Sequence, residues 1–281
     1  MHLYKTSKGN ILKVSGKYYL MTEEWDELIN RDKLFEYLSS LASDENIASD
    51  DHAENFINNY LLPPIGMQEV WAAGVTYLRS RDARMEESED SGAADCYQRV
   101  YEATRPELFF KSLPHRVSGH QQKVNIRKDS AWDVPEPELT LYINKHGKIQ
   151  AYTIGNDMSS RSIEGENPLY LPQAKMYERS AAIGPCLYIT EEPISLDTVI
   201  SMNIYRGSQK MFDDATTLGR MKRTLPELAS WLFKAMDFEH GVFLMTGTCV
   251  VPDNSFTLQE NDVVNISIEG IGTLTNVIGV K

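Results

Sequence analysis

The chain has 281 residues, 42% of them hydrophobic, which is enough to bury a core. A formal net charge of −12 with no basic stripe argues against a nucleic-acid partner. The three cysteines lie far apart without C-x-x-C spacing, the first residues lack the apolar stretch of a signal peptide, and no run approaches the ~18 apolar residues of a membrane span. We therefore expect a cytoplasmic protein with no disulfide framework, no thiolate zinc site and no membrane contact.

Residues 1–62 predict a small N-terminal domain. Residues 1–21 alternate around Ser15-Gly16, which indicates two short strands joined by a turn. Residues 34–41 then carry leucine and phenylalanine at helical spacing. The stretch 43–55 is acidic and thin in apolar residues, and Leu62-Pro63-Pro64 breaks the chain, so we place a domain boundary near residue 62.

Residues 63–281 predict a second, mostly β domain, so the expected class is α+β. Short β-prone runs separated by Gly, Pro, Asn and Asp begin at Gln68. One clear helix interrupts them at 225–236, where Thr224 and Glu227 have the spacing of a capping box. The charged stretch 79–104 turns helical at its end, and it fits a lid over a site as well as a solvated surface loop.

Two carboxylates stand at the start of an apolar run, at Glu136 and Glu138. Residues i and i+2 of a strand point to the same face, so these like charges converge unless a cation or proton lies between them. Asp157 ends the next strand, after a turn at 145–148 that makes the two strands antiparallel neighbours. Three carboxylates without His or Cys favour Mg²⁺, with Mn²⁺ or Ca²⁺ as alternatives. Spacing alone also fits surface acids at a strand end, because E-x-E is a common pattern.

A longer set of motifs, which covers residues 68–281 in order, resembles the fumarylacetoacetate hydrolase superfamily. The spacing from Glu138 through Asp157 to Lys175 is also similar to that of the superfamily's shorter members. The motifs are Glu136-Pro137-Glu138, Asn156-Asp157-Met158-Ser159-Ser160-Arg161, Lys175 with the four residues before it, Ile183-Gly184-Pro185, Thr246-Gly247-Thr248 and Gly270-Ile271-Gly272-Thr273-Leu274.

Three further segments, 100–111, 129–132 and 166–173, look most like the branch that dehydrates 2-keto-3-deoxy sugar acids such as 2-keto-3-deoxy-D-arabinonate. The resemblance implies a small N-terminal domain followed by a catalytic domain built on a mixed β-roll. It also implies an Mg²⁺-dependent lyase that converts a small 2-oxo acid into 2,5-dioxopentanoate or an analogue, and a homodimer or homotetramer.

Residue roles follow from the same resemblance. Glu107 is the expected general acid or base, and Lys175 the partner of the 2-keto oxygen or of the enolate formed when the C3 proton leaves. Thr248 is expected to bind the substrate carboxylate, although a turn threonine also serves the backbone.

Two further predictions rest on position in the chain and not on the resemblance. Arg79 and Arg81 are expected to bind substrate from the possible lid, although most single arginines are simply solvated. His120 is a candidate proton carrier or supporting group because it lies close in sequence to Glu107, although most single histidines are not catalytic.

Ser80 marks a departure from the members that cleave carbon–carbon bonds. Those members usually carry a water-orienting histidine at the place that Ser80 takes after Gly74-Val75-Thr76-Tyr77. Loss of water needs no attacking water, so the serine favours a dehydratase. Hydrolysis of an acylpyruvate or decarboxylation of oxaloacetate on the same fold remains the alternative.

Overall fold

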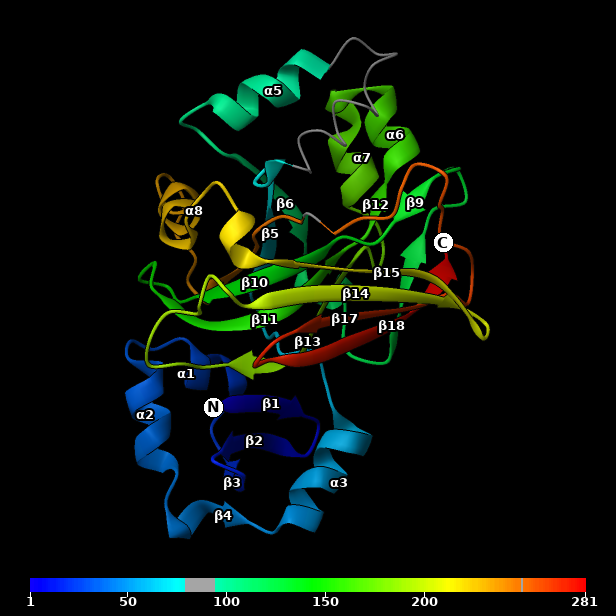
Figure 1. Cartoon of the computed structure of the whole chain (residues 1–281). Helices are drawn as coiled ribbons and strands as arrows, with labels where there is room; N and C mark the ends of the chain where they lie inside the picture. Colours follow the sequence, from blue (N-terminus) through cyan, green and yellow to red (C-terminus); the bar gives the residue numbers. More distant parts are fainter. Residues whose placement is uncertain (79–93, 249) are drawn as a thin grey trace.

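The computed structural model describes residues 1–78, 94–248 and 250–281, without the side chains of 94–96. Two sheets dominate this part of the chain, and their inner faces form one core (Figure 1). Leu139, Leu141 and Ile154 of the larger sheet pack there with Met202 and Ile266 of the smaller one. The second face of the larger sheet is covered too, so its central strand β10 is buried along its whole length, as expected of a strand inside two layers.

The larger sheet has eleven strands in the described residues, and it is mixed: most pairs are antiparallel, while β16–β5 and β13–β7 are parallel. Its strands, in spatial order, are β4 (Ile47–Ala48), β3 (Lys17–Met21), β2 (Gly9–Val14), β1 (His2–Thr6), β13 (Ala181–Tyr188), β11 (Ile149–Asp157), β10 (Pro137–Ile143), β16 (Val242–Met245), β5 (Glu69–Gly74) and β6 (Glu107–Ser112), with β7 (Val117–Ser118) beside β13. The smaller sheet runs β15 (Gln209–Thr217), β14 (Val199–Arg206), β17 (Val263–Ile268), β18 (Gly272–Val280) and β8 (Gln122–Ile126), and β9 (Asp133–Val134) pairs with β12 (Ser159–Ser160).

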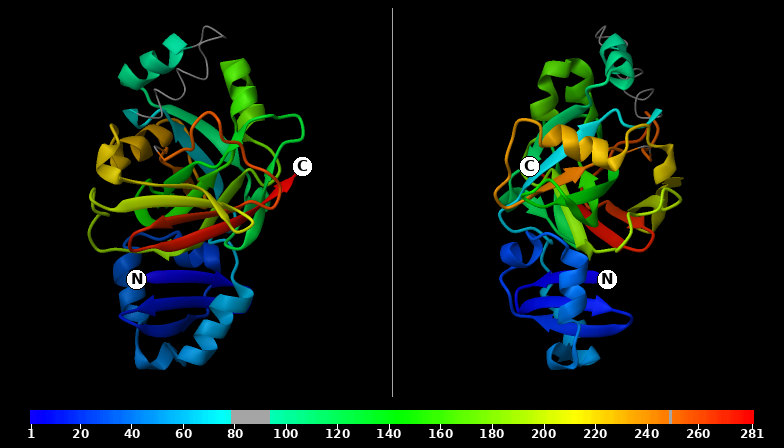
Figure 2. Two further views of the ribbon diagram at one scale, coloured as in Figure 1. Left: turned by 45° about the vertical axis from the view of Figure 1, so that its right-hand side comes forward. Right: turned by 90° about the vertical axis from the view of Figure 1, so that its left-hand side faces the viewer.

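Short helices close the ends of the sheets. The N-terminal ones lie at the opposite end of the molecule from α5, α6 and α7 (Figures 1 and 2). The α-helices are α1 (Trp25–Ile29), α2 (Leu34–Leu41), α3 (Asp50–Tyr60), α5 (Ala94–Glu102), α6 (Arg161–Glu166), α7 (Leu171–Lys175) and α8 (Leu225–Leu232), and the 3-10 turns are η1 (Asp44–Asn46), η2 (Pro114–Arg116), η3 (Pro168–Tyr170) and η4 (Leu218–Arg220). No helix in the described ranges is long and apolar enough to cross a membrane.

The predicted elements are largely present. The α+β class with mixed sheets is confirmed, and so are the hairpin at Ser15-Gly16, the helix at 34–41 and the helical end of 79–104. The capping box of Thr224 and Glu227 is formed, but α8 ends at Leu232, four residues before the predicted end. Residues 1–21 hold three strands rather than two, because β1 precedes the hairpin.

Helix α3 was not predicted, because the stretch before it is acidic. Ser49 stands at its N-cap, and Asp50 and Asp51 lie in its first turn, where negative charge favours a helix. Ala53, Phe56 and Ile57 then pack on the N-terminal strands. The acidity therefore marks a helix start instead of a linker.

Residues 1–62 extend the larger sheet, because β1 pairs antiparallel with β13. Their side chains share a core with the rest of the chain, in which Leu3 and Leu28 pack in one cluster with Val70, Ile183 and Phe243. The boundary near residue 62 stays a prediction.

Candidate active site

Three carboxylates converge at the end of the β10–β11 hairpin. Glu138 pairs with Gly155 across the two strands, and the Asp157 amide donates to the Glu136 carbonyl at 3.0 Å. One oxygen of each carboxylate of Glu136, Glu138 and Asp157 lies within 4.8 Å of the others. All three residues are at most 3% exposed. The predicted convergence is therefore present, and the acids are buried, unlike surface acids at a strand end.

Lys175, at the C-terminal end of α7, reaches between two of these acids. Its ammonium donates to Glu136 Oε2 at 2.6 Å, to Asp157 Oδ2 at 2.9 Å and to Ser159 Oγ at 2.5 Å. Arg161, in the first turn of α6, donates to Glu136 Oε1 at 2.6 Å. Both oxygens of Glu136 thus accept from a cation, which fixes the orientation of that carboxylate.

Lys111 of β6 completes the cluster, and the sequence reasoning missed its role. Its buried ammonium lies 2.5 Å from Asp157 Oδ1 and donates to the carbonyls of Met158 at 3.0 Å and Lys175 at 2.5 Å. Burial, with the nearby Lys175 charge, lowers the pKa of Lys111 to about 8. The only signal in the sequence is a lysine directly after the apolar run 108–110. A lysine that is buried there needs an anion beside it.

Glu138 is the acid that no Lys or Arg pairs with in the part of the chain that the structure describes. Its Oε2 accepts from the Gly247 amide at 2.5 Å. Burial and the charges of Asp157 and Glu136 raise the pKa of Glu138 well above its usual range. Gly247 is needed at that position, because its φ is +97° and a Cβ would lie 1.9 Å from Thr76 Oγ1.

The donor set fits a hard divalent cation. Three carboxylates offer oxygen ligands only, as Mg²⁺, Mn²⁺ and Ca²⁺ prefer, and the described residues around them add no His or Cys ligand. A cation beside Glu138 would also offset the negative charges of Asp157 and Glu136, which help to keep Glu138 protonated, and would favour its ionised form.

A small cavity of about 10 Å³ lies beside the acids, which is room for about one water-sized particle. Its wall includes Val75, which holds a φ of +54°, an unusual value for a β-branched residue and one often found at functional sites. The other residues that line it are Ala73, Gly74, Phe109, Glu136, Glu138, Asp157, Arg161, Lys175, Gly247 and Thr248.

The remaining predicted residues fall into three groups. Thr248 lines the cavity, and the Glu107 carboxylate packs against Gly74, which also lines it. His120 is not among the lining residues of this cavity, and its Nδ1 accepts from the Thr275 amide of the smaller sheet at 3.1 Å. Its role as a proton carrier stays a prediction. Arg79, Arg81 and Ser80 lie outside the described residues.

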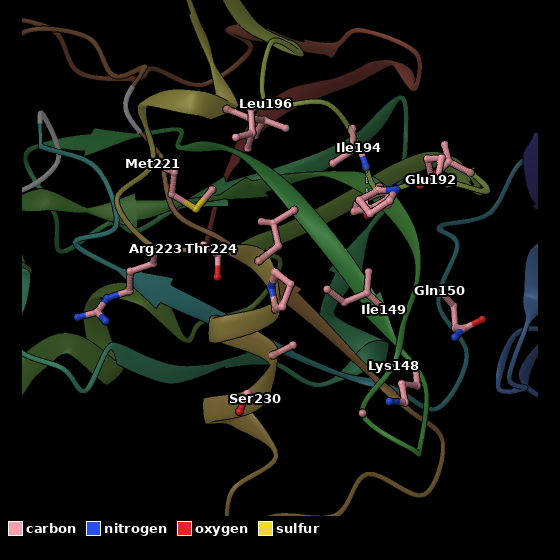
Figure 3. Close-up of a pocket in the computed structure, with 18 of the residues that line it drawn as sticks. Lys148, Ile149, Gln150, Glu192, Ile194, Leu196, Met221, Arg223, Thr224 and Ser230 are labelled. Carbon is pink, nitrogen blue, oxygen red and sulfur yellow. Dashed lines mark hydrogen bonds between the residues drawn. The ribbon is translucent and has the colours of Figure 1, made fainter.

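A larger cavity of about 650 Å³ lies elsewhere, between the β10–β11 turn, the 190–196 segment and the start of α8 (Figure 3). Its lining is mainly apolar, with Ile149, Ile194, Leu196 and Met221 among the labelled residues. None of the predicted site residues that the structure describes lines it. Size alone therefore does not mark the chemical site.

Comparison with known proteins agrees with this geometry. Residues 70–279, which contain all three acids, match the family model described as fumarylacetoacetate (FAA) hydrolase, C-terminal. The chain belongs to the fumarylacetoacetate hydrolase family.

Two curated members of the fumarylacetoacetate hydrolase family are similar to the chain over most of their length. A Haloferax volcanii protein named probable 2-keto-3-deoxyxylonate dehydratase is 47% identical over 224 residues, 79% of this chain and 75% of that protein. A Saccharolobus solfataricus protein named 2-dehydro-3-deoxy-D-arabinonate dehydratase is 40% identical over 215 residues, 75% of this chain and 72% of that protein. A solved structure described as 2-keto-3-deoxy-D-arabinonate dehydratase complexed with magnesium and 2,5-dioxopentanoate matches with a TM-score of 0.84 and 28% identity, over 100% of this chain and 98% of that one.

Proposed function

We propose that the chain is an Mg²⁺-dependent dehydratase of a 2-keto-3-deoxy sugar acid, with 2-keto-3-deoxy-D-arabinonate or a close analogue as substrate and 2,5-dioxopentanoate or an analogue as product. The observation that carries the proposal is the buried set Glu136, Glu138 and Asp157 with Lys175 between two of its members. The dehydratases at 47% and 40% identity, and the magnesium and 2,5-dioxopentanoate in the solved neighbour, support it.

Glu136, Glu138 and Asp157 would hold the metal. When bound, Mg²⁺ supplies a Lewis acid for the substrate's carboxylate and 2-keto oxygens. The described residues provide the rest of the electrostatic environment. Lys111 and Arg161 hold Asp157 and Glu136 in fixed orientations, so the two carboxylates need little rearrangement to act as ligands.

Lys175 is the proposed partner of the 2-keto oxygen. Its three N–H groups donate to Glu136, Asp157 and Ser159, so a 2-keto oxygen would take the place of one of these acceptors, for which the neutral Ser159 hydroxyl is suited. The positive charge then favours negative charge on that oxygen. Thr248, in the same wall, is the proposed hydrogen-bond donor to the substrate carboxylate. Arg79 and Arg81 stay predicted substrate contacts.

Glu107 is the proposed proton-transfer group. The reaction removes a proton from C3 and expels the C4 hydroxyl as water, which leaves a double bond between C3 and C4. Transfer of a proton from C5 to C3 then gives the C4–C5 enol, which tautomerises to the aldehyde product. A carboxyl beside the cavity can accept the first proton or deliver one to the leaving hydroxyl. Glu107 is suitably placed, because its side chain packs on Gly74 at the cavity wall.

We also propose that the chain forms a homodimer or homotetramer and acts in the cytoplasm. Light scattering coupled to size exclusion tests the subunit number: the mass of a single chain at micromolar concentration would contradict the first part.

The proposed function is tested by incubating protein and Mg²⁺ with a panel of 2-keto-3-deoxy-pentonates, 2-keto-3-deoxy-hexonates, acylpyruvates and oxaloacetate, with products identified by mass. We expect loss of one water from a deoxy sugar acid. Release of pyruvate from an acylpyruvate, or of carbon dioxide from oxaloacetate, without dehydration of any sugar acid would identify the alternative reaction.

A further inference from the structure

The guanidinium of Arg223 lies at the C-terminal end of α5. One terminal nitrogen donates to the Thr104 carbonyl at 3.0 Å and to Glu227 Oε1 at 2.8 Å. The other donates to the Ala103 carbonyl at 2.7 Å, with longer contacts to the carbonyls of Val100 at 3.3 Å and Arg105 at 3.4 Å. Arg223 is only 6% exposed, so these contacts are shielded from water.

This position suits a cation. The last carbonyls of a helix have no partner within the helix and carry the negative end of its dipole. A guanidinium carries several N–H donors in one fixed plane, so Arg223 can bind several carbonyls at once. A lysine ammonium is a compact charge without this fixed fork of donors. The backbone of 100–105 is thus fixed by one side chain from another part of the chain.

Arg223 is itself held firmly. Glu227 accepts from it with Oε1 and from the Thr224 amide with Oε2, inside the capping box of α8. Although Arg223 is among the residues at the larger cavity, its side chain points away from the other labelled side chains (Figure 3). Two further contacts join the same segments: the Arg105 guanidinium lies 4.7 Å from the Trp231 ring centroid, and Lys222 donates to the Tyr101 carbonyl.

The carbonyls that Arg223 binds lead directly to Glu107. Only Pro106 separates Arg105 from Glu107, which begins β6. The proline ring restricts the backbone at this link, so little free rotation separates the carbonyls that Arg223 binds from Glu107. Glu107 pairs with Gly74 of β5, and its carboxylate packs on that residue at the cavity wall.

We propose that Arg223 is a positioning residue, which sets the placement of Glu107 by binding the carbonyls at the end of α5. The proposal rests on the proposed function, because it assigns Glu107 the proton transfer. Arg223 acts through Glu107 and has no contact with substrate in this account.

The test compares Arg223→Lys with Arg220→Lys, the same change at an exposed arginine three residues earlier. We expect Arg223→Lys to lower kcat by about tenfold or more, with KM and Mg²⁺ affinity close to wild type. In a Glu107→Gln background the same change should lower the residual kcat by much less, because the group that Arg223 positions is gone. Arg220→Lys should leave kcat unchanged in both backgrounds.

Hydrogen exchange of the 100–107 amides tests the positioning role without relying on dehydratase activity. Faster exchange there in Arg223→Lys, with a wild-type circular dichroism spectrum, supports the positioning role even if no panel acid is dehydrated. Unchanged exchange overturns the proposal, and so does an equal kcat loss with and without the Glu107 carboxylate. Arg223→Gln gives a second variant if Arg223→Lys does not fold.

Discussion

Among single residues, the site contains three buried cationic side chains and three buried carboxylates. Lys111, Lys175 and Arg161 pair with Asp157 and Glu136. Glu138 is left with the Gly247 amide among the described residues, and its raised pKa follows from burial and from its charged neighbours. Glu138 is therefore the acid whose state should respond most to metal.

Glu138→Gln tests this directly. The amide keeps the shape of the side chain but removes one anionic ligand, so Mg²⁺ affinity measured by calorimetry should fall by roughly a hundredfold or more, and activity should be lost. Without Mg²⁺, the free energy of unfolding should be equal to or above that of wild type, because a buried ionisable group is gone. Glu269→Gln, at an exposed position, is the control. A Glu138→Gln variant with normal Mg²⁺ affinity would refute the ligand assignment.

The raised pKa of Glu138 also predicts a pH dependence. Without metal, the folded chain keeps the Glu138 proton at a pH at which the unfolded chain has lost it, so this group's contribution to stability declines as the pH rises between the two pKa values. Mg²⁺ needs the ionised carboxylate. The increase in Tm that Mg²⁺ causes should therefore be larger at about pH 8 than at about pH 5.5 in thermal unfolding. An increase that is equal at both values, or larger in acid, would contradict the assignment.

At the scale of elements, the β10–β11 hairpin supplies the acids, and β6 and α7 supply the lysines. Sequence reasoning found the hairpin, because Glu136, Glu138 and the turn at 145–148 are local signals. It did not find Lys111, because β10, β16 and β5 lie between β11 and β6 in the sheet, and a local pattern does not show that Lys111 nevertheless reaches Asp157. The role of His120 stays a prediction, and in the described structure its Nδ1 accepts from the Thr275 amide of the smaller sheet.

Lys111→Met should show how far one side chain ties these elements together. The change removes the buried ammonium beside Asp157 Oδ1 and the hydrogen bond to the Met158 carbonyl. We expect a loss of about 3–5 kcal/mol in the free energy of unfolding, measured with urea. Lys210→Met, which removes an exposed ion pair on β15, is the matched control and should change the free energy of unfolding much less. An equally small loss at Lys111 would show that its ion pair contributes little to the fold.

At the scale of the whole molecule, residues 1–62 are joined to the rest through both the sheet and the core. The sequence indicated a boundary from the acidic stretch and the prolines. These signals concern exposed residues and the connecting segment. They do not show with which other side chains the leucines of residues 1–62 pack. Leu3 and Leu28 pack with Val70 and Phe243, which only the folded arrangement reveals.

A shortened chain of residues 63–281 tests how independent the larger part is. Without β1, the edge of β13 and the apolar cluster beside it would meet water, so we expect a poorly folded chain that binds a hydrophobic dye and unfolds without a sharp transition. The full-length protein is the control. A sharp transition together with wild-type Mg²⁺ affinity would instead show two independently stable domains.

In the proposed function, the three acids support metal-dependent loss of water from a 2-keto-3-deoxy sugar acid. The direct measurement is proton NMR of 2-keto-3-deoxy-D-arabinonate with EDTA-treated protein, before and after Mg²⁺ is added, for wild type and Glu138→Gln. We expect signals of 2,5-dioxopentanoate only with wild type and Mg²⁺. Equal product formation without Mg²⁺, or with Glu138→Gln, would contradict it.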